Sequence, residues 1–218
     1  MSAVPAPRTG GPTPTPTPTR ATAPPAHSAR GHVRATVLLV VLTLLVSGFA
    51  YPLVLTGIAQ LIDPSAANGS LLPDGNQTVG SSLVAQNLSA PYLFWERPSL
   101  TDYNTTLGSV VPYGASDPAL AAWLNETLAY MREYGNFTVN QTLPFWYVSP
   151  SASALDPDLT PEAVLVQVPR VAEANNLTIG VVTGLVNAHI ETSPIPYLGV
   201  PYVNVLELDL ALVRMTGR

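Results

Sequence analysis

The chain has 218 residues, no cysteine, nine arginines, no lysine and a formal net charge of −5. All fourteen acids and only five of the arginines follow residue 62, so that part carries 5 − 14 = −9. A nucleic-acid partner needs a basic footprint, which this acidic part lacks, and we expect none. Without cysteine the part has no disulfide and must depend on its own core, which about 150 residues can form as one domain.

Residues 1–32 are rich in threonine and proline, and residues 12–19 alternate the two with no apolar face. Such a composition cannot bury a core, so we expect a disordered tail. Four arginines lie before the apolar segment that follows and no acid does. Because positively charged flanks stay in the cytoplasm, the tail is predicted to be cytoplasmic.

Residues 33–62 form the predicted membrane helix. No charged residue lies between Ala35 and Ile62, and about 20 helical residues suffice to cross roughly 30 Å of hydrocarbon. The alternative is a cleaved secretory signal with its cleavage point near Ala50. A signal core ends in polar sequence, whereas apolar residues resume here after Pro52, so we favour a retained anchor.

Three residues of this helix are predicted to serve helix packing. Pro52 lacks a backbone donor and should kink the helix. Gly48 and Gly57 leave flat surface where a second helix can approach closely. A helix packed against partner subunits can use such features, and we expect both protein and lipid as its neighbours.

Asn-X-Ser/Thr sequences are confined to the part after the apolar segment. They favour an exterior location for residues 63–218 and predict a glycoprotein. Their asparagines are Asn68, Asn76, Asn87, Asn104, Asn125, Asn136, Asn140 and Asn176.

Helix and strand signals alternate irregularly after residue 62. A helix should start at Asp117 and end at Gly135, a second should start at Thr160 and be bent or weakened by Pro169, and a third should start near Thr178. Aromatic and β-branched runs predict four strands. The strands are expected at 82–87, 92–95, 145–148 and 203–206. The fold class is therefore an α+β extracytoplasmic domain anchored by a single N-terminal transmembrane helix.

Signatures of enzymes are scarce, and we expect no catalytic residue and no metal ligand. His189 is the only histidine after residue 62 and is interpreted as a surface or helix-end residue rather than a catalytic base. The Asp156–Asp158 stretch is interpreted as a turn rather than a cation site, and Glu96 with Arg97 as a surface pair. There is no Gly-rich phosphate loop and no Asp-Lys-Thr-Gly phosphorylation motif.

Several short motifs occur together in a characteristic order. They are Tyr51-Pro52-Leu53-Val54-Leu55-Thr56-Gly57, Arg97-Pro98-Ser99, Asp117-Pro118-Ala119-Leu120, Ser151-Ala152-Ser153-Ala154-Leu155-Asp156-Pro157, Gln167-Val168-Pro169-Arg170-Val171-Ala172 and Val203-Asn204-Val205-Leu206. With them, residues 34–212 closely resemble the C subunit of the Kdp potassium-transporting P-type ATPase.

The resemblance implies a non-catalytic accessory subunit of a high-affinity potassium uptake complex. Its partners would be a channel-forming, potassium-binding subunit and an ATP-hydrolysing subunit, whose ATP affinity it would raise as a catalytic chaperone. Gln167 and Arg170 are family-level candidates for a nucleotide contact. An outer domain is separated from cytoplasmic ATP by about 30 Å of hydrocarbon, so ATP is implied by the resemblance alone and no directly bound cofactor is expected.

Two other classes remain open at this stage. One is a self-contained membrane-anchored surface glycoprotein or adhesion module, which would purify without large membrane partners. The other is an extracytoplasmic hydrolase, against which the single histidine of the outer part argues.

Overall fold

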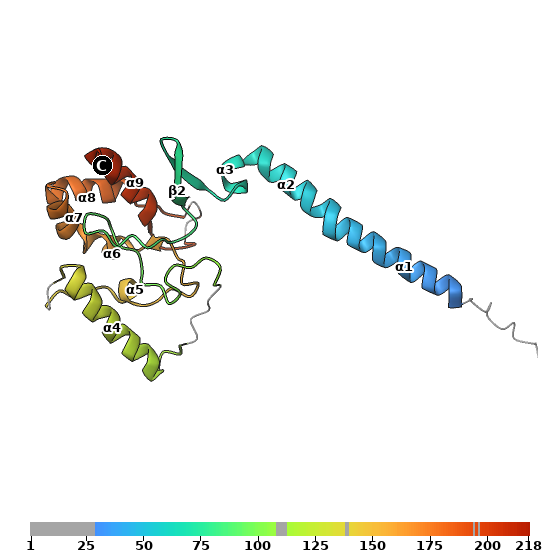
Figure 1. Ribbon diagram of the computed structural model, residues 1–218, viewed down its shortest axis with the longest axis horizontal. Coiled ribbons are helices and arrows are strands. Elements are labelled where there is room, and N and C mark those ends of the chain that lie inside the picture. The colour runs from blue at the N-terminus through green and yellow to red at the C-terminus, as the bar shows by residue number, and fades with distance from the viewer. Residues whose placement is uncertain (1–28, 108–112, 138–139, 194, 196) are drawn as a thin grey trace, which may run out of the picture. The chain divides into compact units, whose positions relative to one another are not determined.

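The computed structural model describes residues 29–107, 113–137, 140–193, 195 and 197–218 (Figure 1). Most of the predicted Thr/Pro tail lies outside these residues. The chain divides into two compact units, Met1–Leu55 and Thr56–Arg218. Helices and two small antiparallel sheets make up the second unit, which confirms a mixed fold of helices and short strands.

The predicted membrane helix forms as α1 (Ala29–Leu45), a π-helical turn (Val46–Ala50) and α2 (Tyr51–Ile62). The run Gly31–Ile62 is the one helix of the described residues that is long and apolar enough to cross a membrane. The expected disturbance at Pro52 takes the form of the π-helical turn: the Tyr51 N–H donates to the carbonyl of Val46, five residues back. Because Pro52 has no N–H, the regular hydrogen-bond ladder cannot continue through it.

A short helix and a hairpin open the second unit, and neither was predicted. Helix α3 (Pro64–Ala67) begins at Asp63, whose side chain accepts from the Ala66 N–H. Strands β1 (Leu71–Asp74) and β2 (Gln77–Ser81) pair antiparallel around a turn at Gly75, which has a φ of 59°. A proline in β1 and few β-branched residues weaken the strand signal.

The three predicted helix starts are confirmed. Helix α4 (Pro118–Tyr134) is capped by Asp117, which accepts from the Ala119 N–H, and ends at Gly135. Helix α8 (Ile179–Ala188) is capped by Thr178 and ends at His189, which is therefore a helix-end residue as predicted.

The helix predicted from Thr160 is divided in two. Helix α6 (Pro161–Leu165) begins at the Thr160 cap, and α7 (Val168–Ala174) follows after one irregular turn. The break lies where Pro169 offers no N–H to the carbonyl of Leu165. Pro169 therefore does more than bend the helix.

The strand predictions are wrong at three of four places. Residues 82–87 and 92–95 contain no strand, and residues 145–148 form α5 (Phe145–Val148). At 203–206 only β4 (Val203–Asn204) forms, paired antiparallel with β3 (Asp158–Leu159). Helix α9 (Val205–Thr216), which was missed, starts directly after it because the Asn204 side chain accepts from the Glu207 N–H.

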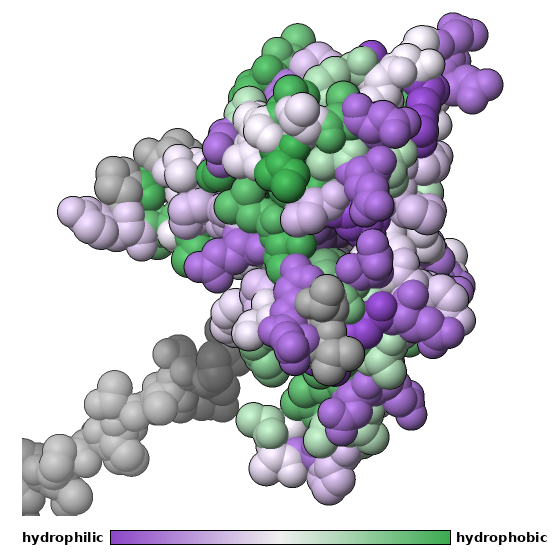
Figure 2. Space-filling view, turned by 90° about the vertical axis from the view of Figure 1, so that its left-hand side faces the viewer, coloured by the Kyte–Doolittle hydropathy of each residue, from purple (hydrophilic) through white to green (hydrophobic). Residues whose placement is uncertain are grey.

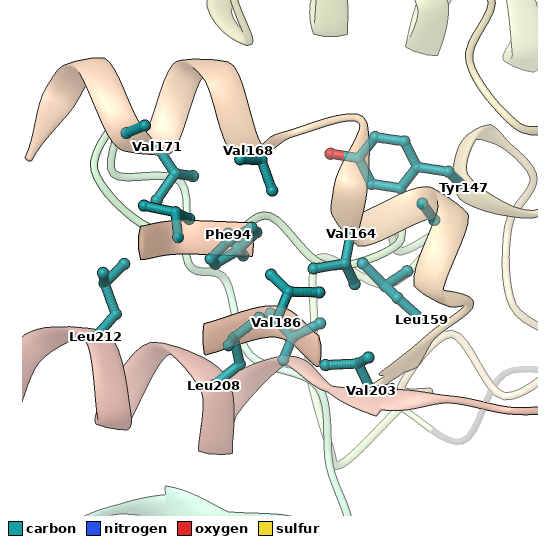
Figure 3. Close-up of a cluster of buried hydrophobic side chains, with 14 of the residues drawn as sticks. Phe94, Tyr147, Leu159, Val164, Val168, Val171, Val186, Val203, Leu208 and Leu212 are labelled. Atoms are coloured by element: carbon teal, nitrogen blue, oxygen red, sulfur yellow. The ribbon is translucent and has the colours of Figure 1, made fainter. Parts of the chain in front are cut away.

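The core of the second unit surrounds Phe94, which lies on an irregular segment rather than on a strand (Figure 3). Valines and leucines of the surrounding helices point at its ring, and Tyr147 of α5 closes one end of the cluster. Phe94, Tyr147 and Leu208 are fully buried. The irregular segment that carries Phe94 is thus anchored in the core by this side chain.

Apolar side chains also reach the surface of the protein. Figure 2 shows them gathered in patches among polar side chains on one face. The exposed large apolar residues of the second unit include Ile179 and Val181 of α8, and Tyr197, Leu198 and Val200 of the loop before β4.

Candidate functional site

Buried polar side chains at the start of α7, within α7 and on α9 hold segment 91–97, which crosses the second unit without regular secondary structure. Gln167 accepts from the Trp95 N–H at 2.7 Å and donates to the Trp95 carbonyl at 3.0 Å. The Gln167 amide therefore makes the two main-chain hydrogen bonds to Trp95 that a neighbouring strand would otherwise make. Asp209 binds the N–H of the preceding residue alone, accepting from Phe94 at 2.9 Å.

Arg170 completes this network. It is 7% exposed, and it donates to the carbonyls of Pro91 and Leu93 at 2.6 and 2.9 Å and to Gln167 Oε1 at 2.8 Å. Its guanidinium lies 4.8 Å from the centre of the Trp95 ring. Burial lowers the pKa of Arg170 from its usual value, and these contacts offset the cost of burying the charge.

The two family-level candidates for nucleotide contact, Gln167 and Arg170, are thus neighbours inside the protein. Gln167 is 0% exposed, and its amide is committed to Trp95, Ala163 and Arg170. The amide of Gln167 and the guanidinium of Arg170, which would have to bind a phosphate, already donate to main-chain carbonyls. Their assignment as nucleotide contacts stays a prediction, while their observed role is to hold segment 91–97.

Glu96 is a buried acid, and its interpretation as half of a surface pair is wrong. It is 3% exposed. Its Oε2 accepts from the Gln86 N–H at 3.2 Å, and its Oε1 is buried without a hydrogen-bond partner among the described residues. Burial, reinforced by the charge of Asp209, raises the pKa of Glu96 to about 9. Glu96 is therefore protonated at neutral pH.

Arg97 turns away from Glu96 and binds the turn that follows α5. It pairs with Asp156 at 3.0 Å and donates to the carbonyls of Ser149 and Pro150. Asp156 also accepts from the Asp158 N–H at 3.2 Å, a local side-chain contact of the kind found in turns, but Asp158 itself begins strand β3. Where the chain is described, no group of three or more metal-ligating side chains occurs.

A pocket of about 330 Å³ lies between α4 and residues 87–103. Aromatic residues supply much of its wall. They are Trp95, Tyr103, Trp123 and Tyr130. Three acids also line it: buried Glu96 and exposed Asp102 and Glu126. The Tyr103 hydroxyl donates to the Arg97 carbonyl at 2.9 Å, which fixes that wall.

The three predicted packing residues lie on the N-terminal helices. A β-carbon placed on Gly48 or Gly57 would meet no atom of the described residues within 4 Å. Both positions are therefore open to another helix. Gly48 lies within the π-helical turn, and Pro52 lies between the two glycines near the start of α2. Their role in packing stays a prediction.

Sequence reasoning missed Asp209 and the burial of Glu96. Asp209 lies on the buried face of α9, together with Val205, Leu208 and Leu212. An acid at helical spacing among apolar residues signals a buried polar contact, but the helix itself had been overlooked. Glu96 offers no such signal because the apolar residues of its segment do not recur with the period of a helix or a strand.

Comparisons with known proteins cover nearly the whole of this structure. The family model described as K+-transporting ATPase, c chain, matches residues 33–214. The potassium-transporting ATPase KdpC subunit of Geobacter sulfurreducens is 40% identical over 182 residues, which is 82% of this chain and 94% of that protein. The KdpC subunits of Burkholderia orbicola and Serratia proteamaculans are 41% and 36% identical over 83% of this chain, with 94% and 97% of their own length covered. The chain belongs to the KdpC family, the c chains of K+-transporting ATPases.

Proposed function

We propose that this chain is a non-catalytic accessory subunit of an ATP-driven potassium uptake complex, anchored in the cell membrane by one helix. The observation that supports this best is the helical run Gly31–Ile62, in which a stretch of 18 residues has a mean hydropathy of 2.4 and no burial. Such a surface needs lipid or other membrane helices around it. With the arginines on its N-terminal side, residues 1–32 are cytoplasmic and residues 63–218 extracytoplasmic.

Its partners are the channel-forming and the ATP-hydrolysing subunits of the same complex. Gly48, inside the π-helical turn, and Gly57, on α2, expose bare backbone. In a membrane, small residues allow close helix contact, which lipid tails alone do not require. Lipid covers the remaining surface of the helix.

By family membership the chain raises the ATP affinity of the hydrolysing subunit, and we assign this effect to assembly rather than to a nucleotide contact. About 30 Å of hydrocarbon separates an outer domain from cytoplasmic ATP. The candidate residues Gln167 and Arg170 are moreover buried and bonded to the main chain. The chain itself then binds no nucleotide.

An exterior domain also accounts for the Asn-X-Ser/Thr sequences. All eight of their asparagines are exposed, so each could be reached by a glycosylating enzyme in a cell that has one. The alternative, a self-contained surface glycoprotein or adhesion module, requires no partner helices. It predicts that substitutions at Gly57 have no effect on any complex.

Gly57→Leu is expected to abolish co-purification of the channel-forming subunit, because an isobutyl group blocks the close helix contact. Thr56→Leu is the matched control. It adds an apolar side chain one residue away, about 100° around the helix, and should leave the complex intact. The measurement is the yield of partner subunits bound to a tagged chain from detergent-solubilised membranes. Equal yields for both variants would show that the Gly57 face meets lipid.

A further inference from the structure

Asparagine in the outer part of this chain precedes serine or threonine far more often than composition requires. The chain has eleven asparagines, all after residue 62, and eight of them begin an Asn-X-Ser/Thr sequence. Serine and threonine make up 24 of the 156 residues after residue 62, so a random order would give about two such sequences. Turns favour asparagine and hydroxyl residues singly, without this fixed spacing. The excess therefore points to the attachment of saccharide to asparagine.

The sequence at Asn104 presents its amide and its hydroxyl together. Asn104 Oδ1 accepts from the Thr106 hydroxyl at 2.7 Å and from the Thr106 N–H at 3.0 Å. Both residues are exposed, and Asn104 Nδ2 has no hydrogen-bond partner in the described part of the chain. A transferase that must hold the amide and the hydroxyl at once finds both on one exposed turn.

The sequence at Asn68 is exposed but closed by hydrogen bonds. Its Nδ2 donates to the Pro64 carbonyl at 2.7 Å and to Gln60 Oε1 at 3.3 Å. Its Oδ1 accepts from Gln60 Nε2 at 3.0 Å. A saccharide on this nitrogen would replace one N–H donor and force a bulky group between α3 and the end of α2.

The sequence at Asn125 is closed by the geometry of α4. Successive residues of a helix are about 100° apart, so residues two positions apart point to nearly opposite sides. Asn125 is exposed, whereas Thr127 is buried. No enzyme can hold both groups unless α4 unwinds. Two unusable sequences are about the number that composition alone would supply.

We propose that Asn104 is the acceptor of an N-linked saccharide that is added to the folded domain outside the membrane, and that Asn68 and Asn125 are not modified. The inference rests on the exterior location of residues 63–218 in the proposed function. It adds a covalent modification that assembly of the potassium uptake complex does not by itself require.

The donor is a saccharide joined through its anomeric carbon to the phosphate of a membrane lipid. The bond between the anomeric carbon and the phosphate oxygen breaks, and that oxygen keeps the electron pair. The anomeric carbon forms its new bond to Asn104 Nδ2, which gives up one proton to a base of the transferase. The product is an uncharged substituted amide.

The test is mass spectrometry of the full chain, purified with its complex from the cells that make it. The intact mass should exceed that of the sequence, and peptide fragmentation should place a saccharide on Asn104. Occupancy at Asn68 should be at least about tenfold lower, the equivalent of two hydrogen bonds that must first break. Asn125 should carry no saccharide.

Single substitutions in the turn identify the groups that are recognised. Thr106→Ala keeps Asn104 but should abolish its saccharide, whereas Thr106→Ser and the matched control Thr105→Ala should retain it. Retention in Thr106→Ala, or equal occupancy of Asn104, Asn68 and Asn125, would overturn the inference.

Protease added to intact cells separates this inference from the proposed function. An unmodified Asn104 in a domain that the protease cuts would overturn the inference and leave the exterior location standing. Protection of the domain from the protease would contradict both.

Discussion

Arg170→Met is expected to lower the free energy of unfolding by about 3–5 kcal/mol, because two partly buried carbonyls lose a charged donor at about 1–3 kcal/mol each. Those carbonyls belong to Pro91 and Leu93. The contact of the guanidinium with the Trp95 ring is lost as well. Methionine retains much of the apolar volume, so the effect reports the hydrogen bonds rather than a cavity.

Arg214→Met is the matched control for this variant. Arg214 pairs with Asp74 at 3.3 Å, and their side chains are 55% and 40% exposed. Such a surface pair contributes about 1 kcal/mol or less. The measurement is urea denaturation of the full chain in detergent, followed by tryptophan fluorescence. If Arg170 served mainly as a ligand contact, both variants would unfold at the same urea concentration as the parent.

Glu96→Gln is expected to remove a large part of the pH dependence of stability. The pKa of Glu96 lies at about 9 in the folded chain, against an ordinary value of 4.5. Between these values the unfolded chain has released the proton and the folded chain has kept it, so stability falls as pH rises. The loss is about 1.4 kcal/mol per pH unit, or about 4 kcal/mol between pH 5 and pH 8.

Denaturation midpoints at pH 5, 6, 7 and 8 measure this slope. The glutamine variant should be clearly less sensitive to pH than the parent, although Asp209 and Asp158, whose pKa values burial also raises, keep some slope. Glu133→Gln, on the exposed side of α4, should follow the parent. Parallel curves for the parent and Glu96→Gln would show that Glu96 is not a buried neutral acid.

Local signals predicted the starts of α4, α6 and α8, although not those of α3, α5 and α9. Asp117, Thr160 and Thr178 cap their helices through hydrogen bonds that span two or three residues, so the information lies within a few positions of the sequence. The apolar helix is equally visible because length and composition alone define it. Pro169 ended a helix rather than bending it, again through a local effect of its missing N–H.

The strand predictions failed because the residues that decide the structure of these segments lie far from them in the sequence. Residues 92–95 have the composition of a strand, but their main chain is bonded by side chains that lie 72 and 115 positions further on, Gln167 and Asp209. Without a partner strand the segment remains irregular, and its Phe94 enters the core singly. No pattern within the segment itself reveals that Gln167 and Asp209 will bind its main chain.

The candidate pocket could not be predicted for the same reason. Trp95 and Glu96 meet Trp123 and Glu126 only because α4 packs beside the irregular segment. The sequence neighbourhood of Glu96 and Arg97 indicated an exposed ion pair. Burial of Glu96 and the pairing of Arg97 with Asp156 depend on residues far along the chain.

Cysteine labelling in intact cells tests most directly the claim that the folded domain works from outside the membrane. The chain has no cysteine, so Ala152→Cys, at an exposed position of the domain, and Thr13→Cys, in the N-terminal tail, each create one reactive site. With a membrane-impermeant maleimide, the Ala152→Cys variant should be labelled in intact cells and the Thr13→Cys variant only after lysis. Protection of the Ala152→Cys variant until lysis would place the domain beside cytoplasmic ATP and contradict the account.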